Sequence, residues 1–394
     1  MRHTPRSSLF CHISGVFRCR FSGVVLAATA LSLSISMASP IVACAAMVDA
    51  FSTYGRSWRE ITLPPIGAGS FGVALDALPD GRLIAVTGLG VRVETSPGSG
   101  VFTLAATIDP AIVGGSTDPS FVRISPGGAR VALGAGFGKP VVVFDTSVLS
   151  SAAPVTISTT TSKAFEVPYD SAVWADDRNL ALTAGAFGSP STVTLLDTTS
   201  ATGAPINPII IDNIAGATGG IAFDAAGRLY TANGFDNGPG GTGTGSVRAF
   251  GPAAWSVATA APDFESQGDA IIDILSGAGL AFDDAGNFFV GGGDFFGGGE
   301  TGFLAVVRAG AVSSALAGLG PVDPLAMSDV RRLDPLGDGS GFYAALFNPV
   351  TRELLVQSGG RVFATVPEPG AVMLIIISAV GSAGTRRRDR HASA

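Results

Sequence analysis

Acidic side chains beside two glycine-rich stretches are the residues of this sequence best suited to hold a metal ion. Calcium takes six to eight oxygen ligands from carboxylates, amides and carbonyls, and loops of this kind supply such oxygens. An Asp at these places also has a structural explanation, because its side chain can start a turn by bonding to its own backbone. Both interpretations stay open, so calcium is the one cofactor for which the sequence offers ligands. The candidates are Asp283, Asp284, Asp294 and Glu300 around one stretch, and Asp224, Asp236 and Asn237 around the other.

Histidine and cysteine are confined to the ends of the chain. The three histidines are His3, His12 and His391, and the three cysteines are Cys11, Cys19 and Cys44. A central region without imidazole or thiol excludes a Ser-His-Asp triad, a cysteine nucleophile and a His/Cys zinc site. No catalytic residue is therefore assigned, and no metal ligand is fixed.

Two further groups of residues have non-catalytic interpretations. A connection broken by proline and glycine holds Asp329, Asp334 and Asp338, and a solvated loop explains all three. The stretch 136–139 superficially resembles a phosphate loop. Leu133 stands where that loop needs its first glycine and Pro140 where it needs Ser or Thr, so we reject it.

The composition favours an exported β-rich protein and argues against nucleic-acid binding. Charged residues make up 14% of the 394 residues, and there are 54 glycines; soluble domains average about 25% charged residues. The formal net charge is −7. Residues 1–46 carry four positive charges and residues 371–394 a net three, which leaves −14 on the region between them. A region this acidic is repelled by phosphate backbones.

The elements that must position these side chains form a repeat of about fifty residues. The segments 220–233 and 279–292 both read as an apolar strand, an Asp-containing turn that ends in Gly, and a second apolar strand. Successive intervals between the large apolar residues before each turn are 49, 50, 49, 59 and 65, and glycine-rich insertions at 235–246 and 291–302 lengthen the last two. These apolar residues are Leu75, Ile124, Trp174, Phe223, Phe282 and Phe347.

A third strand follows each hairpin, at 91–94, 141–145, 192–197, 246–250, 303–308 and 361–365. Three or four short antiparallel strands, repeated about six times, are typical of β-propeller blades. The sequence therefore predicts an all-β protein with a propeller, most simply of six blades, over residues 47–365. A segment near Ile61–Leu63 is expected to close the ring with the last blade. A large sandwich or a β-solenoid is the competing architecture.

The copies at 219–250 and 278–308 resemble NHL-type repeats, well in two repeats and loosely in four. Propellers host enzymes, binders and scaffolds alike. Six-bladed lactonases and gluconolactonases use a central calcium held by acidic and amide side chains, so the lack of histidine leaves that activity open. A cluster of such ligands at the channel mouth would favour the enzyme, and an apolar or glycine-lined channel would favour a binder.

The first 46 residues read as a signal peptide. Four arginines precede an apolar stretch at 24–37, and Ala43-Cys44-Ala45 offers an Ala-x-Ala cleavage pattern. The segment 41–44 also resembles a lipobox, in which Cys44 would be acylated. The two interpretations stay open.

The last residues resemble a PEP-CTERM sorting tail. The motif Val366-Pro367-Glu368-Pro369-Gly370 is followed by an apolar run at 371–383. This run is short against the about 20 residues that span a bilayer. The cationic end would stay cytoplasmic by the positive-inside rule. The resemblance implies an exosortase-type enzyme that cuts near the motif. The run closes with Arg386, Arg387, Arg388 and Arg390.

Together these patterns predict a signal peptide at 1–46, a propeller at 47–365 and a sorting tail at 366–394. The expected function is that of an exported, non-enzymatic binding or structural protein. It would be anchored in the cell envelope by the C-terminal helix and then lie at the surface or in the matrix. Its expected partners are the processing enzyme and an exopolysaccharide or other surface proteins. The alternative is a calcium-dependent, lactonase-like hydrolase.

Overall fold

The computed structural model describes residues 51, 54, 57–63, 74–116, 118–136, 138–166, 171–184, 191–200, 208–214, 218–233, 246–255, 260–274, 277–292, 303–324, 328–333, 335, 341–358 and 360–366. The chain divides into two compact units, 1–47 and 48–394. All described residues belong to the second unit, and the signal peptide prediction lies outside them.

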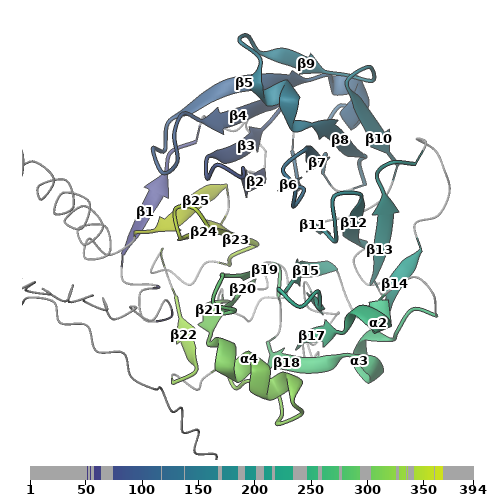
Figure 1. Cartoon of the computed structure of the whole chain (residues 1–394), viewed down its shortest axis with the longest axis vertical. Coiled ribbons are helices and arrows are strands. Elements are labelled where there is room, and N and C mark those ends of the chain that lie inside the picture. Colours follow the sequence, from purple (N-terminus) through teal and green to yellow (C-terminus); the bar gives the residue numbers. More distant parts are fainter. Residues whose placement is uncertain are drawn as a thin grey trace, which may run out of the picture. The chain divides into compact units, whose positions relative to one another are not determined.

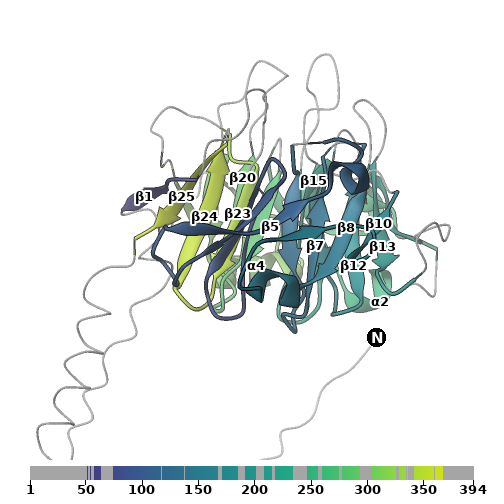
Figure 2. The same cartoon turned by 90° about the horizontal axis from the view of Figure 1, so that it is seen from above.

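Six sheets are arranged in a ring, one blade each (Figure 1). Their strands run between the two faces of the ring (Figure 2). The innermost strands, blade 1 to blade 6, are β2 (Ala74–Ala77), β6 (Phe121–Ile124), β11 (Ser171–Trp174), β15 (Thr218–Phe223), β19 (Gly279–Phe282) and β23 (Ala344–Asn348). The second strands are β3 (Leu83–Thr87), β7 (Arg130–Gly134), β12 (Asn179–Ala184), β16 (Leu229–Asn233), β20 (Phe288–Gly292) and β24 (Glu353–Ser358).

Each blade continues outward with a third strand and an edge. The third strands are β4 (Gly90–Glu94), β8 (Val141–Asp145), β13 (Ser191–Asp197), β17 (Ser246–Phe250), β21 (Phe303–Val307) and β25 (Arg361–Thr365). The outer strands are β5 (Phe102–Ile108) with β9 (Val155–Ile157), β10 (Ser162–Phe165), β14 (Ile209–Ile214), β18 (Asp269–Asp273), β22 (Val330–Arg332) and β1 (Trp58–Ile61). Short helices on the periphery are η1 (Pro110–Val113), η2 (Thr146–Ser150), α2 (Pro252–Trp255), α3 (Phe264–Gln267) and α4 (Ala309–Leu316).

The prediction of an all-β, six-bladed propeller is confirmed. Each repeat found in the sequence coincides with the inner hairpin of one blade, and each expected third strand is present. The hairpins form because the turn chemistry is local. In blade 4, for example, Asp224 accepts bonds from the backbone N–H of Ala226 and Arg228, and Gly227 has a φ of 74°. No helix in the described part of the chain is long and apolar enough to cross a membrane.

Blade 1 departs from the expected register by two residues. The hydrogen bond that closes the turn of the inner hairpin is donated by the Leu78 N–H to the Arg82 carbonyl in blade 1, and by the Asp224 N–H to the Arg228 carbonyl in blade 4. Ala77, not Leu75, is therefore the counterpart of Phe223. Asp76, aligned by sequence with the turn residue, lies inside β2 and is buried. The alignment failed because Asp76 supports a neighbouring blade instead of starting a turn.

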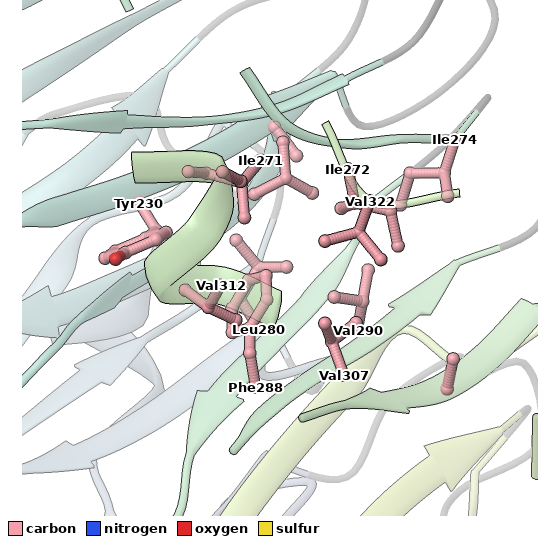
Figure 3. Close-up of a cluster of buried hydrophobic side chains, with 14 of the residues drawn as sticks. Tyr230, Ile271, Ile272, Ile274, Leu280, Phe288, Val290, Val307, Val312 and Val322 are labelled. Atoms are coloured by element: carbon pink, nitrogen blue, oxygen red, sulfur yellow. The ribbon is translucent and has the colours of Figure 1, made fainter. Parts of the chain in front are cut away.

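The core consists of six apolar clusters, one at each interface between neighbouring blades. The largest lies between blades 4 and 5 (Figure 3), where Tyr230 and Phe288 are fully buried and Val312 of α4 covers the outer side. Strands β3, β16 and β20 are buried at every position, because both faces of their blades pack against neighbouring blades. Burial of this kind contributes about 25 cal/mol per Å².

Ring closure occurs as the sequence predicts, through a strand that precedes the first hairpin. β1 pairs antiparallel with β25, Ile61 opposite Val362 and Trp58 opposite Thr365. Arg59 donates two hydrogen bonds from its guanidinium to Glu353 Oε1, at 3.2 and 2.8 Å. The first and last parts of the propeller therefore share one sheet.

Residues ahead of β1 extend this closure to blade 5. The Tyr54 hydroxyl donates to Asp283 Oδ2 at 2.8 Å, and its ring packs edge-on against Phe289 at 4.8 Å. Phe51 is buried beneath the guanidinium of Arg308, 4.2 Å from its ring centroid. Burial and the neighbouring Asp283 raise the pKa of Tyr54 well above its usual range, so its hydroxyl remains a donor.

Candidate functional site

A cavity of about 160 Å³ lies where the inner strands of blades 2 to 6 begin. We call this side of the ring face A and the opposite side face B. The polar residues in the wall are Ser120, Arg123, Ser171 and Tyr343. The rest of the wall is small or apolar: Phe121, Gly219, Ile221, Ala278, Gly279, Leu280, Ala344 and Ala345. No carboxylate or imidazole lines the cavity in the described part of the chain.

Arg123 joins three inner strands at the cavity wall. Its Nε donates to the carbonyl of Ala172 at 2.8 Å, and Nη1 donates to the carbonyls of Val122 at 2.8 Å and Leu75 at 3.3 Å. The indole N–H of Trp174 returns a bond to the Arg123 carbonyl at 3.0 Å. These bonds fix the guanidinium in place before any ligand arrives, which is the condition for low-cost binding.

Asp76 occupies the same register position in blade 1 as Arg123 does in blade 2. Its Oδ2 accepts from the backbone N–H of Ile124 at 2.6 Å, and Oδ1 accepts from that of Ala77 at 2.8 Å. Burial raises the pKa of Asp76, and the charge of Arg123 opposes that rise. Burial likewise lowers the pKa of Arg123, and Asp76 opposes that change. The cavity wall therefore has a buried acid behind its guanidinium, but the carboxylate is directed to backbone donors.

The other half of the ring is held together by close backbone approach. A Cβ on Gly279 would lie 2.8 Å from the backbone of Ala344 and Ala345, and one on Gly220 would lie 2.6 Å from the Ala278 carbonyl. The N–H of Gly220 donates to the Gly277 carbonyl at 2.7 Å. The cavity wall thus has side-chain bridges around Arg123 in blades 1 to 3 and close backbone contacts between blades 4 to 6, where Tyr343 is the one polar side chain among the described wall residues.

Of the aspartates proposed as calcium ligands, Asp224 and Asp283 accept hydrogen bonds within their turns at face B. Asp283 accepts four bonds, from the backbone N–H of Ala285 and Asn287, the Asn287 amide and the Tyr54 hydroxyl. Asp284 pairs with Arg352 at the surface, at 3.0 Å between Oδ1 and Nη2. Asp224 and Asp283 lie in separate hairpins of successive blades, so the structure does not bring them together.

The remaining candidates from the sequence are either exposed to solvent or outside the described residues. Asp329 is exposed, as expected for a solvated loop. Among the described residues, no group of three or more His, Cys, Asp or Glu side chains is placed to hold a metal ion. Val366 is the last residue described, and its N–H donates to the Ser57 carbonyl at 3.0 Å. Outside the described residues lie Asp236, Asn237, Asp294, Glu300, Asp334, Asp338, Pro367, Glu368, Pro369, Gly370, Arg386, Arg387, Arg388 and Arg390.

Sequence reasoning missed the residues of the cavity wall. One signal could have pointed to them, because five of the six inner hairpins align well enough to compare positions. Two residues before each turn, blades 3 to 6 carry Val173, Ala222, Ala281 and Leu346, whereas blade 2 carries Arg123. A charge at a position that is apolar in blades 3 to 6 marks a candidate site, because an ionised group in an inner strand is costly unless it is paired or used. Ser120, Ser171 and Tyr343 give no comparable signal.

No protein-family model matches the chain, and no curated protein matches it in sequence. Solved structures match it in fold. The holo PQQ domain of pyranose dehydrogenase from Coprinopsis cinerea is 12% identical, covers 78% of this chain and 95% of its own, and has a TM-score of 0.51. The PQQ-bound aldose sugar dehydrogenase from Streptomyces coelicolor is 14% identical, with coverages of 78% and 97% and a TM-score of 0.49. The calcium-binding protein regucalcin from Agrobacterium tumefaciens is 12% identical, with coverages of 79% and 94% and a TM-score of 0.48.

Identities this low support the fold alone, and the first of the three agrees with a β-propeller. The chemistry of those proteins depends on particular side chains, and a shared propeller does not carry them over. The NHL-type resemblance and the PEP-CTERM resemblance have no matching family model, and both stay predictions.

Proposed function

We propose that this chain is an exported, envelope-sorted propeller that binds a ligand at its face A cavity without catalysing a reaction. The observation that carries this proposal is the cavity wall, which offers a fixed guanidinium, three hydroxyls and small or apolar side chains. A hydrolase needs a group that takes up and returns a proton near the reacting bond, most often a His or a carboxylate. The described wall holds neither, and it resembles a binding pocket in which a few polar groups orient a ligand.

If the protein were a calcium-dependent hydrolase, calcium binding would stabilise its fold. We expect no such stabilisation. Adding calcium in millimolar excess over EDTA-treated full-length protein should leave the midpoint of thermal unfolding unchanged, because Asp224 and Asp283 are already bonded within their turns. A ligand present at about 100 times its Kd would stabilise the fold by about 2.7 kcal/mol, which differential scanning fluorimetry detects easily.

Magnesium at the same concentration is the control for general ionic effects. A rise in midpoint that saturates at micromolar calcium, and that magnesium does not reproduce, would overturn the non-enzymatic proposal. Lactone hydrolysis would then be the activity to assay.

The export and sorting parts of the proposal rest on the two ends of the sequence. We expect protein isolated from the cells that make it to begin near residue 47 and to end near Pro367–Gly370, as intact-mass spectrometry would show. Changing Glu368 to Ala in the Pro-Glu-Pro motif should leave the tail attached, whereas a matched Glu166→Ala change at an exposed position outside the motif should still allow the tail to be removed. An unprocessed C-terminus at Ala394 in the unaltered protein would contradict the processing step.

A further inference from the structure

Arg123 lines the cavity without an ion pair among the described residues, and it shares that lack with Arg92 and Arg130, which do not line the cavity. Of its five N–H donors, one on Nε and two on Nη1 bond to backbone carbonyls. Within the described residues, no hydrogen bond reaches Nη2 and no ion pair includes Arg123. By contrast, ion pairs with Asp or Glu are made by Arg59, Arg82, Arg178, Arg228, Arg248, Arg352 and Arg361.

A positive charge in a largely enclosed wall favours an anionic ligand. Burying an ionised group is costly unless it is paired, and the nearest acid, Asp76, already accepts two backbone bonds and does not line the cavity. Nη2 therefore has two donors for an incoming oxyanion. A carboxylate is a small oxyanion that can accept charge-assisted hydrogen bonds from these two donors.

The rest of the wall restricts what the anion is attached to. Ser120, Ser171 and Tyr343 place three hydroxyl-bearing side chains around the same space, and Ile221 and Leu280 supply apolar surface. The volume of about 160 Å³ is close to that of a cavity of about 150 Å³ known to hold a six-carbon ring. The ligand is thus small, acidic at one end and able to exchange hydrogen bonds with hydroxyls.

We propose that the face A cavity binds a hydroxycarboxylate no larger than one acidic sugar, with the carboxylate on Nη2 of Arg123. This inference rests on the proposed binding function and names its ligand class. Two sources carry this chemistry, a free hydroxy acid and a uronate residue of an acidic glycan. Both present a carboxylate beside hydroxyl groups, and the experiment separates them.

Calorimetric titration of the full-length protein is the test, with D-galacturonate, D-glycerate, polygalacturonate and inorganic phosphate as probes and D-galactose as the neutral control. Galacturonate should bind at least about tenfold more tightly than galactose, because hydrogen bonds to a charged group contribute about 1.5–3 kcal/mol. The variant Arg123→Met should bind galacturonate at least about tenfold more weakly than the unaltered protein does. The variant Arg82→Met, at an exposed ion pair, should bind galacturonate as tightly as the unaltered protein does.

Arg123 also holds three carbonyls, so its replacement could disturb the fold, and circular dichroism of the variant would show this. The variant Ala278→Leu fills the cavity from the opposite wall without touching Arg123, and it should reduce affinity by a similar factor. If glycerate binds more tightly than polygalacturonate, the ligand is a free hydroxy acid; if polygalacturonate binds more tightly, the ligand is a glycan. Either result supports binding of a hydroxycarboxylate in the cavity.

Equal affinity for galacturonate and galactose, or for galacturonate and phosphate, would overturn the inference. So would a glycan bound equally well by unaltered protein, Arg123→Met and Ala278→Leu, although the binding function itself would then stand. Turnover of a lactone, or binding that requires calcium, would instead overturn the proposed function.

Discussion

Replacing Arg59 with methionine is expected to lower the free energy of unfolding by about 2–4 kcal/mol, because it leaves a buried carboxylate without its partner. Arg59 lies on β1 and Glu353 on β24, and their side chains are 28% and 6% exposed. The second oxygen of Glu353 already has no hydrogen-bond partner among the described residues. The loss therefore falls on the more buried of the two ion pairs that join side chains of β1 to the last blade. Urea denaturation followed by tryptophan fluorescence would measure it.

The same two chain segments provide a matched control. Arg361 and Glu60 also pair across β25 and β1, but both side chains are about half exposed, at 50% and 47%. The variant Arg361→Met should leave the unfolding midpoint nearly unchanged, since exposed ion pairs contribute little. A double variant, Arg59→Met with Glu353→Met, should recover most of the lost stability because no charge is then left buried. Equal effects of Arg59→Met and Arg361→Met would show that ring closure does not depend on the buried pair.

Adding a single methyl group at Gly279 is expected to destabilise the propeller by about 3 kcal/mol or more, the upper range for overpacking. The new Cβ would lie 2.8 Å from backbone atoms of Ala344 and Ala345 in the next blade. Backbone atoms have no rotamer by which to withdraw, so β19 and β23 must move apart. Because both strands line the cavity, the affinity for its ligand should fall together with the midpoint of thermal unfolding.

Gly310 is the matched control for this substitution. It lies in α4, and a Cβ there would meet no atom within 4 Å. Alanine in a helix is favoured over glycine by about 0.5–1 kcal/mol, so Gly310→Ala should stabilise the protein slightly. If Gly279→Ala is tolerated as well as Gly310→Ala, the inner strands are not packed as closely as their backbone distances indicate.

The sequence determined the architecture because the information for each blade is local. An apolar strand, a turn residue with a side-chain acceptor and a glycine at positive φ suffice to form a hairpin, and these recur at near-constant spacing. The blade count, the third strands and closure by a segment near Ile61 all follow from that pattern. The same local pattern misled in blade 1, where Asp76 resembles a turn residue but bonds to the next blade.

Only the tertiary structure decided where the chemistry lies. Arg123, Ser171 and Tyr343 are separated by 48 and 172 positions in the sequence, and nothing in their neighbourhoods links them. They meet because closing the ring brings the starts of the inner strands to one axis. Conversely, Asp283 resembled a calcium ligand in the sequence, but its carboxylate accepts four hydrogen bonds from its own turn and from Tyr54 and has no lone pair left for calcium. Local chemistry fixed the blades, and the convergence of distant strands fixed the site.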